Sequence, residues 1–202
     1  MLAATARLVM RTAVVGTIVT LGSVVATLCI LQPLTYECLH LPPLIVKYDK
    51  VAVSGCDSRL YHKLLFTNQG AVFYHLADPK KTYTLVMVDP DVPLHGDGYF
   101  FLHWLHVGLQ GSDLLSGVIT TGYIISGYVP PMPPPFTGVH RYMFYLFEET
   151  GKGVDRHANI KRFQFNLYKH AKQRGLCGPV AQAMFNTQFS LFTDAFLKNI
   201  LL

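Results

Sequence analysis

The sequence has few charged residues and lacks the cysteine patterns of metal sites. Of its 202 residues 14% are charged and 50% hydrophobic, a balance that excludes an intrinsically disordered chain. The formal net charge of +5 is too small to indicate a nucleic-acid partner. The four cysteines form no C-x-x-C or Cys/His zinc spacing, so we expect no metal and no cofactor.

The motifs of common hydrolases and nucleotidases are also missing. The chain has no G-x-S-x-G, no H-E-x-x-H and no phosphate-binding P-loop. Paired carboxylates can cleave glycosides, but Asp89 and Asp91 stand two residues apart on one turn. That spacing places both on one wall and not on either side of a substrate. We therefore expect a protein that is not an enzyme.

Charge is absent altogether from residues 12–36. Residues 13–31 are nearly all apolar or small, and Arg7 and Arg11 precede them, so we interpret residues 1–36 as a signal peptide or a signal-anchor helix. The small residues around Ala26 favour cleavage, whereas the length of the apolar run approaches that of a membrane-spanning helix. Either way the preceding arginines predict a domain on the non-cytoplasmic side, secreted or membrane-anchored. Mitochondrial import is the alternative.

The cysteine count adds a further expectation about this compartment. Cys29 lies within the apolar segment, so we expect it to leave with that segment or to stay in the membrane. The remaining Cys38, Cys56 and Cys177 predict one disulfide and one free thiol in an oxidising compartment. The pair Cys38–Cys56 is favoured because both flank the start of the domain, although the sequence does not fix the pairing.

The rest of the chain indicates a β-rich α+β domain at residues 51–202, preceded by a linker at residues 37–50. Apolar, β-branched and aromatic runs predict strands at 51–53, 71–75, 82–88, 101–109, 118–120, 123–125, 139–147 and 180–187. Two helices are predicted late in the chain. The first begins after Asn159 and ends before Gly175, and the second covers residues 189–201.

Acids and imidazoles stand at the ends of several of these strands. Asp89 and Asp91 follow strand 82–88 on a turn stiffened by two prolines, and the simplest interpretation of that turn is structural. His103 lies in the next strand, and His140 and Tyr142 open the strand at 139–147. A carboxylate beside an imidazole favours its protonated form. Such an imidazole could hold a phosphate or another anion.

Backbone and loop residues would complete such a site. An amide at or near Gly138 can donate to an anion. Five prolines within residues 130–135, Pro133 and Pro134 among them, form a rigid loop that would make a firm wall. Arg141 alternates away from His140, so we expect it to pair with an acid such as Asp89.

Together these motifs resemble the phosphatidylethanolamine-binding protein family, which includes Raf kinase inhibitory protein and the plant flowering-time regulators. The residues that carry the resemblance are Asp89-Pro90-Asp91-Val92-Pro93, His103-Trp104-Leu105, Pro133-Pro134 and Thr137-Gly138-Val139-His140-Arg141-Tyr142. The resemblance extends from about residue 51 to residue 201. It implies a β-sandwich with short C-terminal helices and a small anion pocket at one end for a phosphate-bearing headgroup. By matching position, the residues lining that pocket would be Asp89, Asp91, His103, His140 and Tyr142, with Pro133 and Pro134 as its wall.

Two of the departures from the family pattern lie in the proline-rich loop. Met132 and Phe136 stand where the family commonly has glycine, and they add apolar bulk around the pocket mouth. The leading hypothesis is non-enzymatic binding of phospholipid headgroups (phosphatidylethanolamine-like) or other small anions, with membrane association through residues 13–31. The alternative is a structural or interaction subunit of a membrane assembly with a vestigial pocket, or an inhibitor of a protein kinase or protease.

Overall fold

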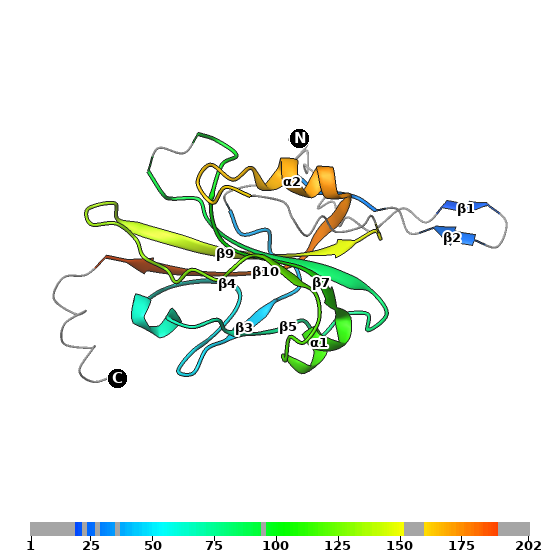
Figure 1. Cartoon of the computed structure of the whole chain (residues 1–202), viewed down its shortest axis with the longest axis horizontal. Helices are drawn as coiled ribbons and strands as arrows, with labels where there is room; N and C mark the ends of the chain where they lie inside the picture. Colours follow the sequence, from blue (N-terminus) through cyan, green and yellow to red (C-terminus); the bar gives the residue numbers. More distant parts are fainter. Residues whose placement is uncertain are drawn as a thin grey trace, which may run out of the picture.

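The computed structural model describes residues 19–21, 24–26, 29–34, 37–93, 96–151 and 160–189. Eight strands form one curled sheet with the order β5-β3-β4-β10-β9-β6-β7-β8, which confirms the predicted β-rich fold (Figure 1). Their bounds are β3 Ile45–Lys47, β4 Ala52–Tyr61, β5 Ala71–Phe73, β6 Thr82–Asp89, β7 Phe101–Gln110, β8 Tyr123–Ser126, β9 Val139–Glu149 and β10 Leu176–Gln188.

Strand β4 turns the sheet into two layers. Its first residues pair with β3, and from Gly55 onward it runs parallel to β10. Gly55 has a φ of 57°, a conformation that glycine adopts without steric strain. As a result β3 and β5 lie beneath the long central strands in Figure 1, with α1 (Gly111–Ser116) on the same side and α2 (Leu167–Arg174) on the opposite side.

Strand alternation gives the central sheet a buried core on each face. On β9, Tyr142 and Phe144 face the core shared with β3 and β5, whereas Met143 and Tyr145 face the core under α2. All seven residues of β6 after Thr82 are buried. The continuous apolar run predicted this, because a strand covered on both faces is apolar throughout. The sheet therefore holds its central strand ends rigidly in place.

The predicted helix before Gly175 is real but shorter than expected. It begins at Leu167, because the side chain of Asn166 accepts a hydrogen bond from the Lys169 amide and caps the first turn. The preceding residues pair with the start of β7 instead, where Phe165 and Phe100 exchange both backbone hydrogen bonds. Gly175 ends the helix in the left-handed conformation, as predicted. The helix predicted at 189–201 lies outside the described residues except for Phe189.

The strand predicted at 118–120 is wrong. This segment is a loop held by the carboxylate of Asp113, which accepts hydrogen bonds from the amides of Thr120 and Thr121. The remaining predicted strands are present. The last one is longer than expected, and a 3-10 helix at Lys63–Phe66 was not predicted.

The domain also includes residues that we expected to be a linker or leader. Strand β3 lies within residues 37–50, and Leu44 and Val46 are fully buried. Leu31 forms a parallel bridge with Gly178, and Gln32 donates to the Gly178 carbonyl at 2.7 Å. These non-local contacts bring the segment before residue 37 against β10.

Two disulfides join these early segments to the sheet. Cys38 pairs with Cys56, as favoured from the sequence, and Cys29 pairs with Cys177. The expectation of a free thiol was therefore wrong, because Cys29 belongs to the folded domain. None of the cysteines among the described residues is free.

Part of the apolar segment at residues 13–31 is also described. It contains two short antiparallel strands, β1 (Val19–Leu21) and β2 (Val24–Ala26) (Figure 1). Within the described ranges no helix has both the length and the apolar character needed to cross a bilayer.

Candidate functional site

The candidate site forms where four neighbouring strands meet at one end of the sheet. Asp89 ends β6, His103 lies near the start of β7, and His140 and Tyr142 lie near the start of β9. Strand β10 adds Thr187, whose register partner is His140. Because β10, β9, β6 and β7 are adjacent, residues from four separate stretches of sequence share one small volume.

His140 is the centre of a buried hydrogen-bond chain. Its Nδ1 lies 2.7 Å from Oδ2 of Asp89, and these two side chains are 0% and 1% exposed. Its Nε2 lies 2.7 Å from Oγ1 of Thr137, and that hydroxyl donates to the carbonyl of Pro134 at 2.7 Å. The chain ties the end of β6 to the proline-rich loop.

The geometry of this hydrogen-bond chain engages the carboxyl of Asp89. A proton must lie between Nδ1 of His140 and the Asp89 carboxyl, since a bare nitrogen lone pair would otherwise face a carboxylate. Oγ1 of Thr137 lies between Nε2 of His140 and the carbonyl of Pro134 and bonds to both. The Asp89 oxygen nearest the ring is therefore bound within the protein.

Asp91 does not join this chain. Its carboxylate accepts from Nε of Arg141 at 2.8 Å and from Nη2 at 2.6 Å, in a bidentate pair. Burial of Asp91 favours its neutral form, but the bonds from Arg141 outweigh burial and leave its pKa below the ordinary value. The expectation that Arg141 pairs with Asp89 was wrong. The amide of Asp91 is the link to Asp89, to which it donates at 2.7 Å.

His103 forms the other wall of the site. Its Nδ1 lies 2.8 Å from the carbonyl of Val129, and its ring centroid is 5.1 Å from that of Tyr142. Burial lowers the pKa of His103, so the free protein holds a neutral ring that donates from Nδ1 and offers Nε2 as an acceptor. Arg162 donates to the backbone carbonyl of His103 at 3.1 Å and fixes this part of β7.

Two buried hydroxyls at the site lie close together but are poorly bonded: that of Tyr142 approaches Thr187, Asp89 and the backbone of Met132. Within the described residues neither the Tyr142 hydroxyl nor the Thr187 hydroxyl makes a hydrogen bond of normal geometry, and both residues are 0% exposed. Burial, followed by the charge of Asp89, raises the pKa of Tyr142, so it remains a neutral donor. Unpartnered buried hydroxyls are uncommon and destabilise a fold by about 1–3 kcal/mol each, which makes them candidate ligand contacts.

The proline-rich loop covers one side of these residues. Pro133 is buried and Pro134 exposed, and Gly138 is exposed with a φ of 83°. Phe136 has a φ of 65° and is 98% exposed, while Met132 is 70% exposed. Phe136 therefore holds a backbone conformation suited to glycine, and its ring contributes nothing to the core.

Sequence reasoning missed three residues of this region: Thr137, Thr187 and Arg162. Thr137 lies inside a motif that was recognised, so its position three residues before His140 was the available signal. Thr187 and Arg162 reach the site only through strand pairing and have no local signal. No three His, Cys, Asp or Glu side chains within the described stretches are grouped so that they could hold a metal ion.

Comparisons with known proteins agree with this architecture. The family model for phosphatidylethanolamine-binding protein matches residues 65–183. The CENTRORADIALIS-like protein of Arabidopsis thaliana is 34% identical over 159 residues, which are 75% of this chain and 84% of that protein. The SELF-PRUNING protein of Solanum lycopersicum is 34% identical over 125 residues, covering 60% of this chain and 67% of that protein.

Solved structures show the same fold at lower identity. The phosphatidylethanolamine-binding protein from Plasmodium vivax superposes with a TM-score of 0.59 at 20% identity, covering 73% of this chain and 85% of that one. A carboxypeptidase Y inhibitor, solved in complex with its cognate proteinase, gives a TM-score of 0.58 at 20% identity, with 73% and 83% covered. With the family model matching more than half of the sequence, the chain belongs to the phosphatidylethanolamine-binding protein family.

Proposed function

We propose that this protein binds a small phosphate-bearing anion, such as a phospholipid headgroup, at the end of the sheet and does not act on it chemically. The observation that carries the proposal is the pair of buried hydroxyls on Tyr142 and Thr187, which lie close together and make no hydrogen bond of normal geometry with any described residue. Both hydroxyls can donate to an anion, and both neighbour the hydrogen-bonded Asp89–His140 pair.

His103 would complete the anion contact by taking up a proton. Its pKa is low in the free protein because burial disfavours the imidazolium, and a bound phosphate would favour that charged form. Binding then takes up a proton whenever the pH lies above the pKa of the free ring. Affinity should therefore weaken as the pH rises from 5 to 8.

The pairing of Asp91 favours phosphate over amine as the recognised group. An ethanolamine ammonium needs an uncommitted carboxylate, yet Asp91 is bound to Arg141 and Asp89 is bound to His140. We therefore propose that the phosphate supplies most of the affinity, and that the group attached to it is less strictly selected.

The same contacts support binding without turnover. His140 is fully buried and both of its ring nitrogens are hydrogen-bonded, so it has no free position from which to serve as a general base. The two disulfides support an exported domain, since such bonds persist in oxidising compartments. We include in the proposal that the apolar run before Cys29 directs export and is either removed by cleavage near Ala26 or kept as a tether. The mature N-terminus of the purified protein tests this part.

Isothermal titration tests the binding proposal, with inorganic phosphate, O-phosphoethanolamine and ethanolamine as separate ligands. We expect both phosphates to bind and ethanolamine not to bind. Tyr142→Phe and Thr187→Val should each weaken phosphate binding roughly tenfold, since a hydrogen bond to a charged group contributes about 1.5–3 kcal/mol. Tyr123→Phe, an exposed tyrosine on β8, is the matched control and should bind normally. Unchanged affinity in both site variants would exclude the proposed contacts.

The exposed residues of the proline-rich loop favour a second candidate function, binding of a protein partner. Phe136 and Met132 offer apolar surface beside the site and support nothing inside the domain. A protein kinase, a protease or a membrane assembly is the class of partner that this candidate would take. An interaction lost in Phe136→Ser and kept in Tyr142→Phe would favour this function over anion binding.

A further inference from the structure

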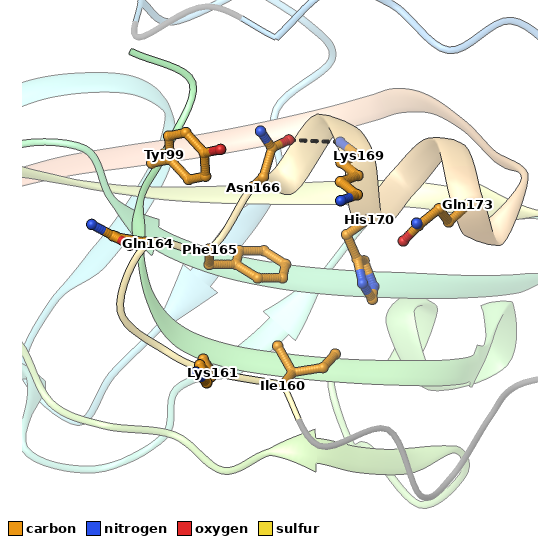
Figure 2. Close-up of a pocket in the computed structure, with 9 residues that line it drawn as sticks. All are labelled: Tyr99, Ile160, Lys161, Gln164, Phe165, Asn166, Lys169, His170 and Gln173. Atoms are coloured by element: carbon orange, nitrogen blue, oxygen red, sulfur yellow. Dashed lines mark hydrogen bonds between the residues drawn. The ribbon is translucent and has the colours of Figure 1, made fainter. Parts of the chain in front are cut away.

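A cavity lies between Tyr99 and helix α2, away from the end of the sheet. It has a volume of about 280 Å³ and is lined by Tyr99 and by eight of the residues between 160 and 173. Figure 2 shows the Tyr99 and Phe165 rings beside the first turn of α2, with Lys161 below and Lys169 and His170 on the helix. None of the lining residues belongs to the site of Asp89 and His140.

Among the described residues that line this cavity, the charged ones are positive. They are Lys161 and Lys169, and none of the described lining residues is acidic. Within the described part of the chain neither lysine forms an ion pair. The first turn of α2, capped by Asn166, adds the positive end of a helix dipole. An anion in the cavity would meet two ammonium groups and no carboxylate of a described lining residue.

His170 supplies a second and independent indication of a ligand. It lines the same cavity, only 9% of the residue is exposed, and its Nε2 makes no hydrogen bond with any described residue. Burial, and then the charge of Arg174, lowers the pKa of His170 to about 4. The ring is thus a neutral group with one N–H and one lone pair, and a bound molecule with polar atoms would satisfy it.

The remaining walls combine the amide side chains of Gln164, Asn166 and Gln173 with apolar rings. Phe165 is 5% exposed, and its backbone pairs with Phe100 through two hydrogen bonds. Its ring lies 5.3 Å from that of His170, and Ile160 and Tyr99 extend the apolar surface. These walls suit a small aromatic or aliphatic body attached to the anionic group.

We propose that the cavity between Tyr99 and α2 is a second ligand site, which binds a small organic phosphate through Lys161, Lys169 and His170. The proposal does not depend on anion binding at the end of the sheet. The two sites differ in what they recognise: here the charge comes from exposed lysines, and the apolar walls select a body larger than phosphate alone.

Titration of the whole ¹⁵N-labelled chain with phenyl phosphate, followed by NMR, tests the proposal. Inorganic phosphate and phenol, each titrated separately, represent the anionic and the aromatic part of phenyl phosphate. We expect saturable shift changes at the amides of Lys161, Lys169 and His170, with phenyl phosphate binding more tightly than either part alone. The variant Lys161→Gln/Lys169→Gln should bind about fivefold more weakly or worse, as expected for two lost, partly screened charge contacts.

Lys172→Gln is the matched control, because Lys172 is exposed on α2 and does not line the cavity. It removes the same charge from the same helix and should change the affinity less than twofold. His170→Phe keeps an aromatic ring in place and should also weaken binding, and thermal unfolding checks that each variant is folded. Equal affinity in the double variant and the Lys172 control would overturn the proposal. So would shift changes confined to His103 and Tyr142, or no saturable change at all.

Discussion

The end of the sheet and the cavity beside α2 hold polar groups in opposite ways. At the end of the sheet the charged groups are matched within the protein: the buried Asp89 with His140, and the half-buried Asp91 with Arg141. Beside α2 the lysines are exposed, and the one buried polar ring, His170, has an unpartnered nitrogen. The difference indicates that the first region is part of the fold's own framework, whereas the charges of the second are not needed for folding.

The largest expected effect follows from breaking the buried pair. Asp89→Ala leaves His140 without its partner in a site that is fully buried, so the free energy of unfolding should fall by about 3–5 kcal/mol. Lys169→Gln, the corresponding change beside α2, should alter it by less than about 0.5 kcal/mol. Urea unfolding measures both. A loss of under 1 kcal/mol in Asp89→Ala would show that the pair is not part of the framework.

The pH dependence of stability is the next largest effect. The folded pKa of His170, about 4, lies below the value near 6.5 for an unfolded chain, so the unfolded state takes up the proton first as the pH falls. His170 therefore favours folding above pH 6.5, and about 3 kcal/mol of that preference is lost by pH 4. His170→Phe should flatten the stability curve between pH 7 and 4. Equal slopes in the variant and the parent would contradict the burial argument.

Tyr142→Phe should separate stability from binding. Removing an unpartnered buried hydroxyl relieves a desolvation penalty, so the protein should be as stable as the parent or more stable by up to about 1 kcal/mol. Phosphate affinity should fall in the same variant. Chemical unfolding and calorimetric titration on one sample provide the comparison. A variant that is clearly destabilised would show that the hydroxyl has a structural partner.

The smallest expected effect is at Phe136. Its φ of 65° strains a residue with a Cβ, and the ring is 98% exposed, so Phe136→Gly relieves strain and loses almost no packing. The free energy of unfolding should change by less than about 1 kcal/mol, in either direction. A larger loss, measured by thermal unfolding, would show that the loop depends on this ring.

Sequence patterns predicted the central strands well and the connections between them less well. The short continuous apolar run of β6, rich in β-branched residues, favours a buried strand. In contrast, Ile160 and Leu167 have helical spacing, yet the residues between them form a turn followed by a single β-bridge at Phe165. Backbone pairing of Phe165 with Phe100 determines that conformation, and residues so far apart in sequence leave no local signal.

The candidate site was likewise predicted correctly where a local motif exists and less well where distant residues decide the contacts. Asp89, His103, His140 and Tyr142 were found because each stands in a motif at a strand end, and the structure brings these four together. Asp91 was placed in the pocket, but its carboxylate is bound to Arg141. Arg141 pairs with Asp91 and not with Asp89 because of the way the turn directs the two carboxylates toward β9. A sequence pattern alone does not distinguish two aspartates in one short motif.

The bond between Cys29 and Cys177 has a mechanical consequence. These residues are 148 positions apart, so one covalent ring encloses nearly the whole sheet. If the chain were pulled by its two ends, β10 would have to separate from β9 and β4, after which the load would pass directly from Cys29 to Cys177. Only the residues outside the ring could extend. A domain built in this way is suited to hold its shape, and any site within the ring, under tension.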